Sequence, residues 1–218
     1  MTLVFSLITL AALSLAAVAL IRSVDTGASI LGNLGFKQDA LLASDEAARQ
    51  AIAWLSTKET DAAKPLHADI AADGYRASLV NNLDATGTHL DPVGTAATSL
   101  RAVVDWDNNG CGTASYPAGT WRTGGCIPSR AVTSSLANGL QARWLVMRVC
   151  AAAGDPSASG ALCAQPINGS LSNSTDKSVV SYTDQQVVQS RMTQYYRVIV
   201  RTTGARNSVS TTETLVHF

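Results

Sequence analysis

The short motif with the clearest chemical meaning is a run of oxygen-bearing side chains between Asp105 and Gly110. Asp105, Asp107 and Asn109 alternate before Gly110, as in the first half of a calcium-binding loop, where alternate oxygens face one ion and glycine permits the turn. The bidentate acid of the twelfth position is missing, because Tyr116 stands there. Backbone carbonyls or an acid from elsewhere would have to complete the site. The alternative is a strand that ends in a turn made by Asp and Asn side chains. Calcium is the one cofactor that the sequence suggests.

The four cysteines fall into two groups that are close in sequence, Cys111 with Cys126 and Cys150 with Cys163. An even number of cysteines in a chain outside the cytosol is typical of disulfides. Of the three pairings that four cysteines allow, the sequential one closes two short loops, each worth about 3 kcal/mol in the chain-entropy model. Buried free thiols are an alternative, whereas zinc is disfavoured because C-x-x-C spacing and a nearby histidine are both missing. We therefore predict the disulfides Cys111–Cys126 and Cys150–Cys163.

The sequence gives little support for catalysis. Three histidines, His67, His89 and His217, lie far apart, and no G-x-S-x-G motif occurs. The sixteen basic and sixteen acidic residues cancel, so charge gives no argument for a nucleic-acid partner. We expect a protein that is not an enzyme. The four tryptophans are expected to pack in the core or on a sheet face rather than to form a sugar-binding platform: Trp54, Trp106, Trp121 and Trp144.

The N-terminal segment, residues 1–21, contains no charged side chain, and Arg22 is the first. As a helix this segment would be about 31 Å long, the thickness of the hydrocarbon core of a bilayer. A cleaved signal peptide would have a basic stretch before its apolar core, and no Lys or Arg precedes the core here. A plain membrane anchor is the simplest alternative.

The helical pattern continues well beyond the apolar segment. Apolar residues recur at three-, four- and seven-residue steps, which predicts one apolar stripe on a helix, and no proline occurs before Pro65. A helix over residues 1–57 would be about 85 Å long, too long to be buried by the domain that follows. Its apolar half must project and needs either lipid or other copies of itself. The predicted stripe comprises Val24, Leu31, Leu34, Leu41, Ala48, Ile52 and Leu55.

Three glycines, Gly27, Gly32 and Gly35, fall in the middle of this predicted helix. Each costs up to about 1 kcal/mol relative to alanine in a helix interior. They predict a local stretch or bend between the two halves of the helix. The alternative is close packing of another helix against these small residues.

In combination, these N-terminal features resemble the type IV pilins, specifically the PilX-type minor pilins and related pilin-like proteins. The resemblance rests on the start MTLV, the uninterrupted apolar run, the sequence GNL at residues 32–34 and ALLASDEAAR at residues 40–49. It covers about 55 residues. Residues 142–149 (ARWLVMRV) and 195–201 (YYRVIVR) resemble the late strands of the family more weakly.

The resemblance implies a precursor with a short basic leader, which a prepilin peptidase removes before the new N-terminus is methylated. Met1 is then the mature N-terminus, with a start codon as the alternative. Pilins usually carry a glutamate where Phe5 stands, and it is thought to neutralise the N-terminal amine of a neighbour. In the family, loss of that glutamate is associated with tip-located subunits such as the K-type pseudopilin. The implied location is the inner membrane before assembly and an extracellular filament on a bacterial cell surface afterwards.

We expect an α+β, pilin-like fold with a stem helix over residues 1–57 and a β-rich extracytoplasmic domain over residues 58–218. Strands are predicted at 101–106, 142–150 and 195–202, and a turn at 204–207 leads into a last strand that forms a hairpin with the previous one. In the second strand, Trp144, Val146 and Arg148 alternate with Leu145, Met147 and Val149. The amphipathic half of the helix should pack on this antiparallel sheet.

The leading functional prediction is a structural subunit that polymerises with copies of itself or with other pilins through its helix. One alternative is a tip-located subunit for priming or cell adhesion, which Phe5 favours. The other is a membrane-anchored extracytoplasmic domain that never polymerises. The residues expected to take part in assembly are Met1, Phe5, Leu10, Leu13, Ala17, Leu20, Val24, Leu31 and Leu34.

Overall fold

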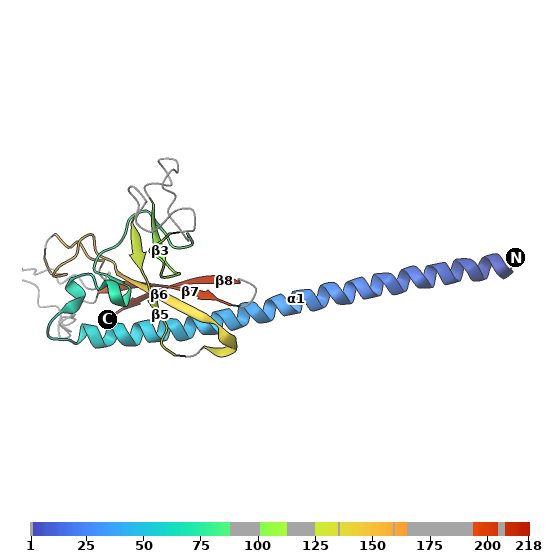
Figure 1. Ribbon diagram of the computed structural model, residues 1–218, viewed down its shortest axis with the longest axis horizontal. Coiled ribbons are helices and arrows are strands. Elements are labelled where there is room, and N and C mark those ends of the chain that lie inside the picture. Colours follow the sequence, from blue (N-terminus) through green and yellow to red (C-terminus); the bar gives the residue numbers. More distant parts are fainter. Residues whose placement is uncertain are drawn as a thin grey trace, which may run out of the picture.

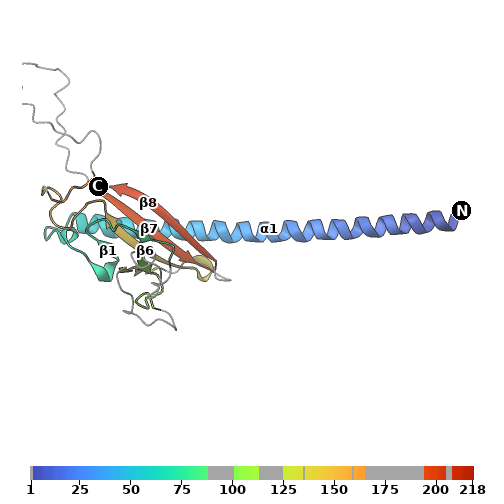
Figure 2. The ribbon, with the colours of Figure 1, turned by 90° about the horizontal axis from the view of Figure 1, so that it is seen from above.

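The computed structural model describes residues 2–87, 101–112, 125–134, 136–158, 160–164, 194–204 and 208–218. Its longest element is helix α1 (Thr2–Glu59), which has 58 residues and a length of about 87 Å. The N-terminal half projects far beyond the domain, and the C-terminal half lies along it (Figures 1 and 2). The predicted helix over residues 1–57 is therefore confirmed, with an end two residues later.

All three glycines of the predicted stretch or bend are helical in the single chain. Helix α1 continues without a break through Gly27, Gly32 and Gly35. A glycine penalty of about 1 kcal/mol each does not open a helix when its backbone groups would gain no other partner. A Cβ atom added at any of these glycines would meet nothing within 4 Å. No neighbouring group of this chain therefore requires a glycine at these three positions.

The main sheet is mixed and mostly antiparallel. Its order is β1 (Tyr75–Arg76), β6 (Gln141–Arg148), β7 (Tyr195–Thr203) and β8 (Val209–His217), and β5 (Arg130–Ala131) also pairs with β6. Only β1 pairs with its neighbour in parallel. The predicted hairpin of the last two strands is confirmed by the antiparallel pairing of β7 with β8. Residues 205–207 of the predicted turn lie outside the described residues.

A second, smaller sheet differs from the expectation of one antiparallel sheet. It contains β2 (Leu83–Asp84), β3 (Ala102–Asp105) and β4 (Cys126–Pro128), all paired in parallel. The strand predicted at 101–106 exists, but it belongs to this sheet. Three short 3-10 helices complete the described elements: η1 (Pro65–His67), η2 (Ala71–Asp73) and η3 (Ala137–Gly139).

The main sheet is covered on both faces, so the domain has three layers. On one face, Trp144 and Val146 pack with Ala51 of α1 and its neighbours. On the opposite face, Leu145 and Met147 pack with the small sheet. The alternation predicted for this strand is confirmed. Burial on both faces explains the four consecutive apolar residues of β6, Trp144 to Met147.

The face of α1 that packs on the sheet differs from the predicted stripe. Of the seven residues predicted to form that stripe, only Leu55 is buried, while Leu31, Leu34 and Leu41 are 50–69% exposed. Small side chains let the helix backbone approach the sheet, and the sheet supplies the bulk through Tyr75 and other large side chains. The buried residues of the helix are Ala40, Ala43, Ser44, Ala47, Ala51 and Leu55.

Candidate functional site

Beyond its first 21 residues, α1 carries a second, uncovered apolar face. Leu31, Leu34, Leu41 and Leu42 are 69%, 50%, 52% and 67% exposed. At 3.6 residues per turn, these leucines lie roughly 120° or more around the helix from the buried Ala47. We call Val24, which is also exposed, and these four leucines the outer apolar face. Helix α1 therefore presents small residues to its own domain and large apolar residues to the surroundings.

The N-terminal half of α1 is apolar and exposed on all sides. By length and composition this helix can cross a membrane, and none of its most apolar segment is buried in the domain. Such a segment serves either as a membrane anchor or as a secretion signal. The predicted assembly residues Phe5, Leu10, Leu13 and Leu20 are 73%, 71%, 71% and 69% exposed, and Ala17 is exposed as well. Met1 lies outside the described residues.

Three polar side chains of this segment are satisfied within the helix. The hydroxyls of Ser6, Thr9 and Ser14 donate to the carbonyls of the residues three positions earlier, at 2.8–2.9 Å. An apolar solvent therefore meets these three hydroxyls already paired. Between residues 2 and 24 the sequence contains no acidic side chain, and Asp25 is the first. With Phe5 in place, no carboxylate in the apolar segment could pair with an amine.

Both predicted disulfides are formed. Cys111–Cys126 joins the loop after β3 to β4, with a Cα–Cα distance of 5.9 Å, and Cys150–Cys163 has a Cα–Cα distance of 3.9 Å. All four cysteines are paired, and Cys111 is packed against Val103 in the small sheet. Two disulfides in a chain with an N-terminal apolar helix indicate an extracytoplasmic protein.

In the proposed calcium motif, the carboxylate of Asp105 closes a turn. Asp105 Oδ1 accepts a hydrogen bond from the Asn109 amide and Oδ2 accepts one from the Gly110 amide, both at 2.9 Å. The side chain of Asn109 donates to the carbonyl of Gly112 at 3.0 Å. Asp107 lies exposed beside this turn. Among the residues that the structure describes, no group of three His, Cys, Asp or Glu side chains could hold a metal ion. Residues 113–124, including Tyr116, lie outside them.

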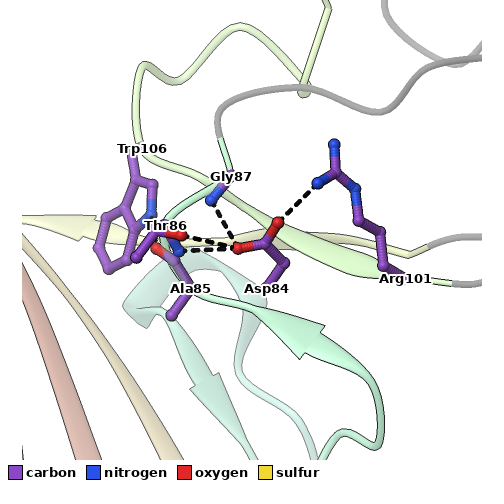
Figure 3. A network of polar contacts seen from close by, with 6 residues as sticks. All are labelled: Asp84, Ala85, Thr86, Gly87, Arg101 and Trp106. Carbon is purple, nitrogen blue, oxygen red and sulfur yellow. Dashed lines mark hydrogen bonds and ion pairs between the residues drawn. The ribbon is translucent and has the colours of Figure 1, made fainter. Parts of the chain in front are cut away.

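A polar network at the end of β2 organises the small sheet (Figure 3). Asp84 Oδ1 accepts hydrogen bonds from the amide and hydroxyl of Thr86 and from the amide of Gly87, and Oδ2 accepts one from Arg101. Burial raises the pKa of Asp84, but these hydrogen bonds and the Arg101 charge outweigh it and lower the pKa below its usual value. The turn thus fixed presents the Ala85 carbonyl to the indole N–H of Trp106 at 2.9 Å.

Three of the four tryptophans have packing roles, as expected. Trp106 and Trp144 are 4% and 2% exposed, and Trp54 packs against the core on the helix side. Trp121 and His89 lie outside the described residues. His67 is in η1 and His217 ends β8, where its ring makes an edge-to-face contact with Tyr195.

The sequence contained a signal for the helix face that the prediction missed. Small residues recur at positions 40, 43, 47 and 51, with the three- and four-residue steps of a single helix face. A search for large apolar side chains overlooks this pattern, because the leucines from Leu31 to Leu42 lie on the outer apolar face.

Comparisons with protein-family models, with curated proteins and with solved structures find no match for this chain. The description of the protein therefore rests on its own architecture. A long N-terminal apolar helix packs on a mostly antiparallel sheet in a domain with two disulfides, and this arrangement is pilin-like.

Proposed function

We propose that this chain is a structural subunit of a type IV pilus or pilus-like filament, and that it polymerises through α1 with copies of itself or with other pilins. The observation that carries the proposal is the outer apolar face. A membrane anchor requires about 20 apolar residues. Leu41 lies twenty positions beyond Ile21, about 30 Å further along the helix, and it is still exposed.

Exposed leucines at that distance from the bilayer are costly in water and have no role in a plain anchor. Burial of each leucine against a neighbouring helix would contribute about 1.5–3 kcal/mol. Within the apolar half, lipid is as apolar as leucine, so close packing at small side chains has to supply the preference for protein over lipid. Such residues are abundant there, among them Ala11, Ala12, Ala16, Ala17 and Ala19.

The test is whether filaments still form after a charged residue is substituted into the outer apolar face. Leu34→Asp should abolish filaments seen by electron microscopy while the protein still inserts into the membrane, because residues 1–21 are unchanged. Leu215→Asp is the matched control, since Leu215 is 61% exposed on β8 and not on α1. Normal filaments with Leu34→Asp, or equal loss with Leu215→Asp, would contradict the proposal.

A tip-located subunit, for priming or adhesion, is the second candidate. The phenylalanine at position 5 favours it, because a tip subunit does not need to neutralise the N-terminal amine of a subunit beyond it. The number of copies along a filament separates the two roles. Labelling of an exposed engineered cysteine should mark the whole length of the filament for a repeating subunit and one end only for a tip subunit.

A further inference from the structure

A cleft of about 660 Å³ lies beside the main sheet, at the ends of β6 and β7. Its volume falls in the range of small-molecule binding sites. Residues of 131–134 and 136–140 form one wall, and Trp106 directly after β3 also lines the cleft. The cleft therefore lies between parts of the chain that are distant in sequence. The lining residues that matter here are Trp106, Asp107, Leu136, Leu140, Arg143 and Arg201.

Two arginines lie directly opposite each other in the wall of this cleft. Arg143 of β6 pairs with Arg201 of β7 in the antiparallel register. Like charges at directly opposite positions of a sheet repel each other. Among the described residues, neither arginine has a carboxylate oxygen within 4.0 Å. Arg143 is held in place through Ser129, to whose hydroxyl and carbonyl it donates at 2.7 and 2.5 Å. These neutral partners fix its guanidinium but leave its charge uncompensated.

Arg201 is the more unusual of the pair. It is 9% exposed, and within the described part of the chain its Nε and Nη1, both closed off from solvent, have no hydrogen-bond partner. A buried guanidinium without partners is costly. Another arginine of the same strand has such partners. Arg197 donates from Nε and Nη2 to the carboxylate of Glu213 at 2.6 and 2.7 Å. Arg201 faces Thr211 across the sheet instead.

The charges and walls of the cleft define the ligand that fits it. Asp107 is the only carboxylate among its described lining residues, so the formal charge of the lining is +1. The exposed Asp107 forms no ion pair with either arginine. Val132, Leu136 and Leu140 give the cleft apolar walls. Guanidiniums at two opposed strand positions suit the paired oxygens of a carboxylate, phosphate or sulfate.

We propose that this cleft binds a small molecule that carries a compact oxyanion, with Arg143 and Arg201 as the groups that hold it. The bilayer is not the source of that oxyanion. Leu136 and Leu140 lie beside α1 at residues 39–46, and residue 39 is about 27 Å along the helix from Ile21. The ligand therefore comes from solution, and its apolar or sugar-like body lies against the leucine wall.

The test uses the full chain in neutral detergent micelles. Unfolding midpoints and titration calorimetry are measured with inorganic phosphate, sulfate and glucuronate, against glucose and sodium chloride at equal ionic strength. At least one oxyanion should raise the midpoint in proportion to the logarithm of its concentration, while glucose and chloride should not. A stronger effect of glucuronate than of phosphate would indicate that the natural ligand carries a carboxylate. A stronger effect of phosphate would indicate that it carries a phosphate group. Micelles containing phosphatidylglycerol should have no effect of their own.

Variants separate a binding role from a structural one. Arg201→Met and Arg143→Gln should each weaken oxyanion binding at least tenfold, whereas the matched control Arg197→Gln should leave it unchanged. Without ligand, Arg201→Met should keep or raise the midpoint, because it removes a buried charge that has no partner. The proposal is overturned if no oxyanion acts beyond chloride, if Arg197→Gln weakens binding as much, or if Arg201→Met lowers the ligand-free midpoint and leaves the oxyanion effect intact.

Discussion

Enlarging the small residues by which α1 packs on the sheet should destabilise the domain more than any change on the outer apolar face. Ala51 has no exposed surface and lies in the core cluster with Trp144 and Val198. Ala51→Leu adds three carbon atoms to this closed contact, and overpacking of a well-packed core costs about 1–3 kcal/mol. For a domain of this size, about 2 kcal/mol corresponds to a fall of about 4–8 °C in the unfolding midpoint.

The matched control is Ala53→Leu, which makes the same change at an exposed position of the same helix. Its effect on the free energy of unfolding should stay within about 0.5 kcal/mol. The complementary variants are Leu41→Ala and Leu42→Ala, which remove large exposed side chains from the outer apolar face. They should leave the monomer equally stable and should weaken filament formation.

The assay is thermal unfolding of the full chain in detergent micelles, followed by tryptophan fluorescence, because Trp144 reports directly on this interface. If Ala51→Leu unfolds at the same temperature as Ala53→Leu, the close contact between α1 and the sheet is not present. If Leu41→Ala destabilises the monomer as much as Ala51→Leu does, the assignment of the two helix faces is wrong.

Four other predictions concern the domain. Replacing Cys111 and Cys126 with serine should lower the free energy of unfolding by about 3 kcal/mol in the chain-entropy model, measured by chemical denaturation against the oxidised chain; an unchanged midpoint would contradict it. Arg148→Leu should cost about 2–4 kcal/mol in the same assay, because the buried guanidinium donates to three backbone carbonyls that would lose their donor. Because the folded pKa of Asp84 is below its ordinary value of 3.8, its stabilising contribution is present above that value and is lost as the pH falls through the lower, folded pKa. Asp84→Asn should therefore be less stable than the parent at pH 7 and approach it in acid, and a constant difference across pH would refute this. Calcium should leave the unfolding midpoint unchanged, because among the described residues no three acidic or histidine side chains gather around Asp105; a midpoint that rises with calcium would support the metal site instead.

Local patterns were sufficient to predict the elements themselves. The length and composition of residues 1–57 predict one long helix, since no proline interrupts them and helical spacing persists throughout. The run from Ala142 to Cys150 predicts a strand with Trp144 and Val146 on one face and Leu145 and Met147 on the other, because successive side chains of a strand point in opposite directions. The spacing of the cysteines favoured the two local disulfides that the structure contains. Each of these inferences depends only on residues that are neighbours along the chain.

Only the tertiary structure decided which faces meet. The helix has two faces that could be buried, and the choice of the alanine face depends on the bulk of Tyr75 and Trp144 in a sheet that begins far along the chain. The parallel pairing of β3 in a second sheet depends on partners that local sequence does not specify. The opposition of Arg143 and Arg201 follows from the β6–β7 register, which joins residues 58 positions apart. The physical reason is that local sequence fixes the period of an element, whereas burial and pairing depend on the shape and charge of surfaces that meet only when the chain folds.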